Sequence, residues 1–250
     1  MSKENCQRIR YNKGMKKTFL LLVLALLILP TTFLKAQEVD LLWQGENYVP
    51  PFYKGRTLWS SQSRITLVAI PHGLGNPASL NYKWTKTGTV LGNLNGIGKN
   101  TISFLDSILS KPQTIKVEII SSSSDEYGQK TVLASASTKI TPLTPSLYIY
   151  ENNPLYGFKF NKEVGNTYKL EGKEVTFTAF PFFFSVFDRT DDVLKYEWGT
   201  NVGGTDTGSS VTYRTPDDAK GASSIRARVS NTYQVTQFAN KNFLIQYENN

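Results

Sequence analysis

Two short aromatic stretches, Tyr82-Lys83-Trp84 and Tyr196-Glu197-Trp198, decide how this sequence folds. Each follows a run of mainly β-branched and apolar residues that ends in proline, residues 66–71 in the first case and 176–181 in the second. Because side chains alternate between the two faces of a strand, the Tyr and the Trp of each stretch lie on the same face. We interpret these two pairs as core residues of two β modules.

The order of strand-like blocks around these stretches repeats along the chain. Pro181 follows Pro71 by 110 residues, Trp198 follows Trp84 by 114, and Ile225 follows Ile115 by 110. A nearly constant offset over several blocks is expected from two copies of one fold. Short, regularly spaced strands without a helical period predict an all-β chain of sandwiches or barrels.

The second copy carries the fuller pattern, in which Tyr196-Glu197-Trp198 is followed by glycines, then by Val211-Thr212-Tyr213 and the alternating residues 225–229. This order resembles PKD or bacterial immunoglobulin-like domains. The Asp-Gly-Asp turn that is common after the PKD tryptophan is missing from both copies, which favours the broader immunoglobulin-like class. The resemblance implies two tandem immunoglobulin-like β-sandwiches used for spacing, adhesion or assembly on a surface or secreted protein. It supplies no catalytic residues.

Residues 1–36 have the composition of an export signal. Lys16-Lys17 precedes an apolar run, residues 18–29, that ends at Pro30. The run is short for about 30 Å of hydrocarbon, so we predict a signal peptide helix that is cleaved after Ala36. An uncleaved signal anchor that tethers the protein to the membrane is the alternative. Met15 directly precedes the two lysines and is a possible true start.

The remainder of the chain is expected to have three parts. Residues 37–62 contain several aromatics and the Pro50-Pro51 pair, which excludes helix. We predict that they form an extended segment packed on the first module. The first sandwich is predicted at residues 63–144 and the second at residues 145–250.

The positive charge of the chain is concentrated in the leader. The formal net charge is +8, but residues 1–36 hold seven basic residues and one acid, which leaves 21 basic and 19 acidic residues elsewhere. A net charge of +2 on the body does not supply the dense basic surface that nucleic acid binding requires. We therefore expect no nucleic acid partner.

The sequence contains no pattern for catalysis or for a cofactor. His72, the only histidine, lies in a Gly- and Pro-containing loop without a nucleophile motif. P-loop, dinucleotide and zinc spacings are also missing. The only cysteine, Cys6, lies in the leader, so neither module contains a disulfide. We expect a protein without enzyme activity and without a cofactor.

One loop holds the best candidates for a metal site. Asp188, Asp191 and Asp192 supply three carboxylates within five residues, and loop oxygens suit Ca²⁺. The spacing is not that of an EF-hand, and a solvated acidic loop is the alternative interpretation.

The run from Phe180 to Phe187 is too apolar for a single core, because alternation buries only about half of it on one face. We predict that Phe182, Phe183, Phe184 and Phe187 form an interaction patch. It would meet the neighbouring module, a protein partner or lipid.

Taken together, these patterns favour a non-enzymatic exported protein of the cell envelope or surface that acts in scaffolding, adhesion or assembly. Its expected partners are other envelope or surface proteins or glycans, with membrane contact only through an uncleaved leader. A carbohydrate-binding module is the alternative, in which exposed Trp43 and Trp59 would stack on sugars.

The leader prediction is tested by the intact mass of protein recovered from the outside of producing cells. We expect the mass of a chain that begins at Gln37. A mass that includes residues 16–36 would instead establish an uncleaved anchor.

Overall fold

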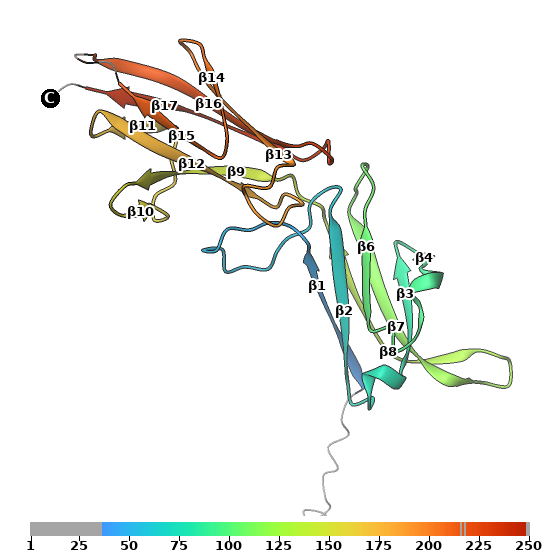
Figure 1. Cartoon of the computed structure of the whole chain (residues 1–250). Coiled ribbons are helices and arrows are strands. Elements are labelled where there is room, and N and C mark those ends of the chain that lie inside the picture. Colours follow the sequence, from blue (N-terminus) through green and yellow to red (C-terminus); the bar gives the residue numbers. More distant parts are fainter. Residues whose placement is uncertain (1–36, 216, 218, 249–250) are drawn as a thin grey trace, which may run out of the picture. The chain divides into compact units, whose positions relative to one another are not determined.

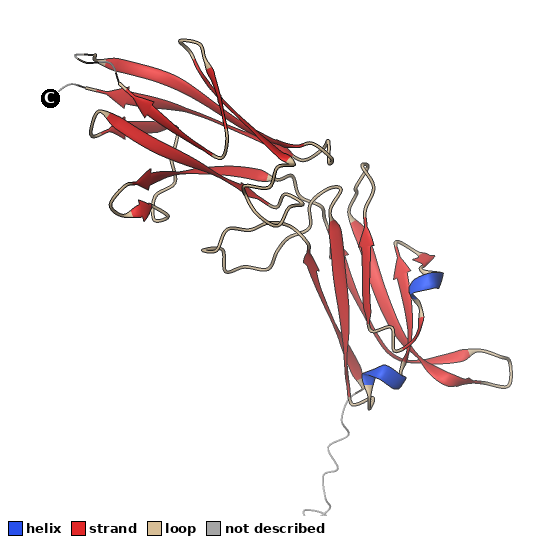
Figure 2. Cartoon of the chain, viewed as in Figure 1, coloured by secondary structure: helices blue, strands red, loops and turns tan. Residues whose placement is uncertain are grey.

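The computed structural model describes residues 37–215, 217 and 219–248, and the predicted leader lies outside them. These residues are almost entirely strands and loops, as Figure 2 shows, and the regular helices among them are two single 3₁₀ turns. The turns are η1 (Pro77–Ser79) and η2 (Gly92–Leu94). In the part of the chain that is described, no helix combines the length and apolar character needed to span a bilayer.

The first sandwich has two sheets with strand orders β1-β2-β6 and β4-β3-β7-β8, and β5 pairs with β3 (Figure 1). All pairings within these sheets are antiparallel. The strands are β1 (Glu38–Gly45), β2 (Arg64–His72), β3 (Asn81–Lys86), β4 (Thr89–Val90), β5 (Gly96–Ile97), β6 (Thr101–Leu105), β7 (Gln113–Ser124) and β8 (Lys130–Ile140).

The second sandwich repeats this arrangement with strand orders β10-β9-β12-β15 and β11-β17-β16-β13-β14. Its one parallel pair joins β11 to β17. The strands are β9 (Ser146–Asn153), β10 (Gly157–Phe158), β11 (Thr167–Leu170), β12 (Glu174–Phe182), β13 (Leu194–Thr200), β14 (Thr205–Thr207), β15 (Ser210–Arg214), β16 (Gly221–Asn231) and β17 (Phe238–Tyr247).

The strand order identifies both units as immunoglobulin-like sandwiches. In immunoglobulin lettering, strands A, B and E form one sheet of each unit and strands C′, C, F and G form the other. The all-β fold of two tandem immunoglobulin-like sandwiches that the sequence predicted is therefore present. The first sandwich begins earlier than the predicted residue 63, because β1 pairs with β2 along its whole length.

The tyrosines of the Tyr-x-Trp stretches are anchored in equivalent ways in the two units. They lie on strands β3 and β13 and are 0% and 6% exposed. The Tyr82 hydroxyl donates to the carbonyl of Pro77 at 3.1 Å, and the Tyr196 hydroxyl donates to the carbonyl of Arg189 at 2.6 Å. Burial raises the pKa of both phenols, which keeps each hydroxyl protonated as a donor.

The two tryptophans repeat the same pattern. Trp84 and Trp198 are 0% and 1% exposed. The Trp84 indole donates to the carbonyl of Lys99 at 2.8 Å, and the Trp198 indole donates to the carbonyl of Gly208 at 2.9 Å. Each ring fills the centre of its core while its polar N–H has a partner, as a buried indole requires. The repeat seen in the sequence is thus a repeat of side-chain environments.

The second half of strand β12 is apolar on both of its faces. Val175, Phe177 and Ala179 point into the core of the second sandwich, whereas Phe180 and Phe182 belong to a separate aromatic cluster. A strand whose two faces are both covered has an almost continuously hydrophobic sequence. The aromatic cluster therefore needs a cover on the outside of the sandwich.

Replacing Trp84 or Trp198 by Ala removes a fully buried ring and its indole hydrogen bond. We expect each change to lower the free energy of unfolding by about 3–5 kcal/mol, measured by urea denaturation. An unchanged stability for Trp198→Ala would contradict the assignment of this ring to the core.

Candidate functional site

Phe158 and Phe160 of the second sandwich cover part of β12, with their ring centroids 5.3 Å from that of Phe180. The rest of the cover comes from a loop that leaves the first sandwich between β1 and β2. Its ends are held together, since the Gly45 amide donates to the Thr57 carbonyl at 2.8 Å and the Asn47 side chain donates to the Leu58 carbonyl at 2.6 Å. A Cβ at Gly45 would lie 2.5 Å from the Leu58 carbonyl oxygen, so this close approach requires glycine. We call residues 46–58 the bridging loop.

The bridging loop packs on the second sandwich. Tyr48 is buried within the core of that sandwich, and Phe52 lies edge-on to Tyr150 at 5.5 Å and to Phe180 at 5.9 Å between ring centroids. Such edge-to-face pairs are favourable beyond the area that they bury. The prediction that residues 37–62 pack on the first module is therefore wrong for the bridging loop, although β1 and Trp59 do belong to the first sandwich.

Two backbone hydrogen bonds fix the loop in place. The Tyr48 amide donates to the Phe184 carbonyl and the Phe183 amide donates to the Tyr48 carbonyl, both at 2.8 Å. Phe183 has a φ of 65°, in the left-handed region that a bulky residue rarely adopts. The hydrogen bond to Tyr48 and the buried Phe183 ring hold this strained conformation.

A fully buried glutamine links the same two sandwiches. The Gln237 side-chain nitrogen donates to the Ser61 carbonyl at 2.9 Å and to the Ser185 hydroxyl at 2.8 Å. Its oxygen accepts from the Ser185 amide at 2.9 Å and from the Asn231 side chain at 3.3 Å. Gln237 is 0% exposed, so these partners replace the water that its amide loses on burial. We call this set the Gln237 network.

A second contact lies beside the Gln237 network. The Gln62 side-chain oxygen accepts from the Thr236 amide at 3.0 Å and from the Thr236 hydroxyl at 2.8 Å. Gln62 also has a positive φ, of 58°. Thr236 and Gln237, which make these two sets of hydrogen bonds with the first sandwich, therefore both lie in the turn that precedes β17.

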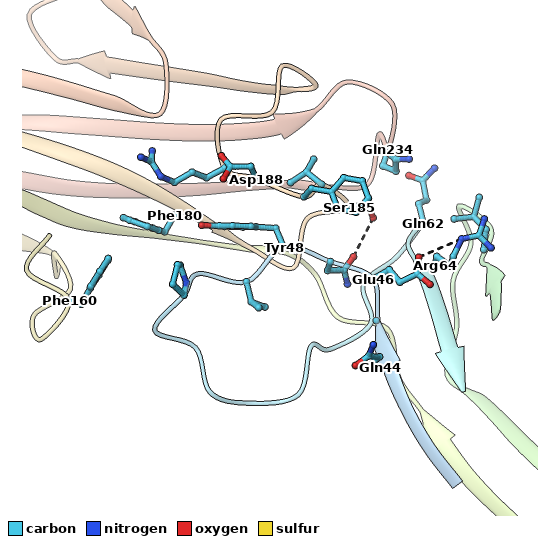
Figure 3. A pocket seen from close by; sticks show the side chains of 18 of the residues that line it. Gln44, Glu46, Tyr48, Gln62, Arg64, Phe160, Phe180, Ser185, Asp188 and Gln234 are labelled. Carbon is cyan, nitrogen blue, oxygen red and sulfur yellow. Dashed lines mark hydrogen bonds and ion pairs between the residues drawn. The ribbon is translucent and has the colours of Figure 1, made fainter. Parts of the chain in front are cut away.

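An open groove runs along the bridging loop where it meets the second sandwich (Figure 3). Its volume is about 990 Å³, near the upper end of the range for ligand pockets. Aromatic side chains line one part, and charged or amide side chains line the rest. The aromatic residues are Tyr48, Phe158, Phe160, Phe180 and Phe187, and the polar ones include Glu46, Gln62, Arg64, Asp188, Arg189 and Gln234.

The two arginines of the groove have different partners. Arg64 lies 3.7 Å from Glu46, and both side chains are about half exposed at 48%. Arg189 donates to the Ser209 hydroxyl at 2.8 Å and lies over the Phe180 ring at 5.4 Å. A guanidinium above an aromatic ring is held by the ring quadrupole while one edge stays free to bind.

The phenol of Tyr48 is kept neutral in this groove. Burial raises its pKa, the positive charge of Arg189 opposes this rise, and the negative charge of Asp188 adds to it. A neutral phenol offers the groove one donor and one acceptor. With its amides, its Arg64–Glu46 ion pair and its aromatic rings, the groove has the chemistry of a binding site.

The predicted interaction patch is mostly buried. Phe182, Phe183 and Phe184 are 7%, 8% and 0% exposed, because the bridging loop covers the first two and the second core takes the third. Phe187 is 100% exposed and lies at the groove. Only this residue of the four remains available to a partner.

The three predicted metal-binding aspartates do not form a site. Two Asp188 hydrogen bonds, from the Thr190 hydroxyl and the Thr190 amide, lower the pKa of its carboxyl. Asp191 accepts from the Val193 amide at 3.2 Å. Among residues that the structure describes, no three His, Cys, Asp or Glu side chains are grouped to hold an ion, Asp192 included.

The predicted sugar-stacking tryptophans are unavailable as an open platform. Trp59 is 1% exposed in the first core, where its indole donates to the Ser63 carbonyl at 3.1 Å. Trp43 is half-buried, with the Arg56 guanidinium 3.8 Å above its ring. The stacking mechanism predicted for carbohydrate binding through Trp59 is therefore wrong.

Packing of residues 180–187 against the neighbouring module was one of the predicted alternatives, and the bridging loop makes this contact with Phe182 and Phe183. The sequence did not predict that residues 46–58 make it, and it did not predict the Gln237 network. His72, the only histidine of the sequence, lies at the end of β2, where its Nε2 is 3.0 Å from an Asp40 oxygen. The aromatic content of the bridging loop and of residues 180–187 was a usable signal, since both have more apolar side chains than one sandwich face can bury. Gln237 gave no such signal.

Comparisons with known proteins place few limits on function. No protein-family model matches the chain, and neither does any curated protein. Similar solved structures include three N-terminal domains of the bacteriophage RB49 outer capsid protein Hoc, with 15% identity, 85% of this chain and 59% of that chain covered, and a TM-score of 0.40. The ICAM-5 D1–D4 fragment has 13% identity, 84% and 53% coverage, and a TM-score of 0.26.

Immunoglobulin domains 1–4 of Sidekick-1 have 10% identity, 84% and 66% coverage, and a TM-score of 0.24. The chain thus spans between about half and two thirds of the length of each of these structures. At these TM-scores the likeness adds nothing to the strand order, on which the assignment of the fold rests.

The Gln237 network gives a direct test of the link between the sandwiches. We expect Gln237→Ala to lower the free energy of unfolding by roughly 2–4 kcal/mol, because it leaves the partly buried Ser185 amide and Ser61 carbonyl without these partners. Urea denaturation should also resolve two transitions in place of one.

The matched control is Gln234→Ala, in the same turn, whose side chain makes no hydrogen bond within the described residues. We expect it to change stability by less than about 0.5 kcal/mol. Equal effects of the two changes would refute a special role for Gln237.

Proposed function

We propose that this chain is an exported, non-enzymatic binding protein of the cell surface or envelope, acting in adhesion or assembly through the groove beside the bridging loop. The leader supports export, because a basic segment followed by a short apolar run is typical of signal peptides. The tandem immunoglobulin-like fold supports a scaffold that carries binding surfaces on its loops.

The observation that carries the proposal is the exposure of Phe187. Its aromatic neighbours in the same run are buried, yet this ring is 100% exposed beside the groove. Exposed aromatics beside a concave surface with arginines are typical of residues that dominate a protein interface. Arg64 and Arg189 supply such arginines. A protein with a complementary apolar and acidic surface is the occupant that fits.

Site-specific crosslinking tests this proposal. A photoreactive phenylalanine is placed at position 187 and the protein is produced in the cells that naturally make it. On irradiation we expect one discrete adduct with a surface or envelope protein. The same group at Val202, which is 82% exposed and outside the groove, serves as the control. A second change, Arg64→Glu, should reduce the adduct at position 187 at least about tenfold, because it reverses a charge at the groove.

Identical adducts from positions 187 and 202 would overturn the proposal, as would an adduct at 187 that Arg64→Glu leaves intact. The thermal midpoint of the Arg64→Glu protein is measured before crosslinking, to establish that this variant is folded. We expect the substitution to change the midpoint little, because Arg64 is half exposed.

A further inference from the structure

The solvent face of the second sandwich carries a row of arginines on β16. Ile225, Ala227 and Val229 are buried in the core, so alternation places Arg226 and Arg228 outward, and both are exposed. The two guanidinium groups project from positions about 6.8 Å apart along one strand. This row lies between β13 and β17, in the interior of a five-stranded sheet.

Amide side chains stand next to these arginines in register. Asn242 is paired with Arg226 and Asn240 with Arg228 on the neighbouring strand β17, and both asparagines are exposed. On the other side, Lys195 is an outward residue of β13. We call Lys195, Arg226, Arg228, Asn240 and Asn242 the polar face.

The positive charge of the polar face is largely uncompensated. Glu197, opposite Arg228, is the one acidic side chain at the outward positions of β13, β16 and β17. No ion pair within the described part of the chain involves Arg226, Arg228 or Lys195. Arg228 otherwise lies 5.9 Å from the ring of Phe238. The guanidinium groups are therefore free to bind carboxylates.

The side chains of this face suit a polysaccharide better than a protein. A protein partner needs an apolar or aromatic centre in its binding surface. The partly exposed Phe238 and Leu244 lie on either side of the polar face and do not form such a centre. Guanidinium groups bind carboxylates in a bidentate manner, and the amides of Asn240 and Asn242 both donate to and accept from hydroxyls. A polysaccharide that bears carboxylates and hydroxyls therefore matches both the guanidinium groups and the amides.

We propose that the polar face binds an acidic polysaccharide, with Arg226 and Arg228 on its carboxylates and Asn240 and Asn242 on its hydroxyls. Its mechanism is hydrogen bonding and charge across a sheet face, which differs from the tryptophan stacking that the burial of Trp59 excludes. The inference concerns a surface other than the groove and does not depend on what binds there.

Affinity electrophoresis or titration calorimetry with polygalacturonate, at about 0.15 M salt, tests it. We expect binding to polygalacturonate and none to neutral dextran. Arg226→Gln with Arg228→Gln should weaken binding at least about tenfold, through loss of the charge-assisted hydrogen bonds. Asn240→Ala with Asn242→Ala should weaken binding to polygalacturonate without a change in net charge.

The matched control is Lys173→Gln with Arg214→Gln, which removes the same charge from side chains that are 78% and 76% exposed outside the polar face. It should bind as the unaltered protein does, and so should Arg64→Glu in the groove. An equal loss in the control would show charge attraction alone and overturn the proposal. If poly-glutamate competes as well as polygalacturonate does, the face binds acidic peptides and the proposal is wrong. A lack of binding to polygalacturonate would also overturn the proposal.

Discussion

The structure depends on the burial of β12 on both sides. Its inner side chains form part of the second core, and its outer ones, Phe180 and Phe182, need a cover that Tyr148 of β9 and Phe158 of β10 supply only in part. The bridging loop completes that cover with Phe52 and Tyr53. Because the loop begins and ends in the first sandwich, the hydrophobic surface of one module is completed by the chain of the other, and the groove and the Gln237 network lie beside this contact.

Local patterns in the sequence were enough to predict each sandwich. The Tyr-x-Trp stretches predicted the central strands, since alternation fixes which side chains share a face and a buried Trp marks strand C in this fold. The excess of apolar residues at 180–187 made a contact between the sandwiches one alternative, but such patterns did not identify the segment that makes it. Alternation shows that both faces of β12 are apolar in its second half, but it does not show which distant segment covers the outer one. Pro50-Pro51 excludes helix from the bridging loop without fixing where the loop packs.

The candidate site was less predictable for a related reason. Phe182, Phe183, Phe184 and Phe187 are chemically alike in the sequence, and only the packing of the bridging loop separates the three buried rings from the exposed one. Gln237 was not predictable either, because its neighbours give no sign that a polar side chain there is fully buried. The polar face differs, since the alternation of Ile225 to Val229 marks Arg226 and Arg228 as outward residues. Its amides come into register only through the pairing with β17.

The bridging loop also constrains the order in which the chain acquires its structure. The loop brings Asn47 to Ser185, which follows it by 138 residues in the sequence. Ser60, just after the loop, contacts Gln237, which follows it by 177 residues. During synthesis from the N-terminus, the loop emerges long before the strand that it covers. Its aromatic side chains stay exposed to water and to other chains until β12 and then β17 have formed. A chaperone that holds apolar segments is most useful to this protein during that interval, after the first sandwich has already folded.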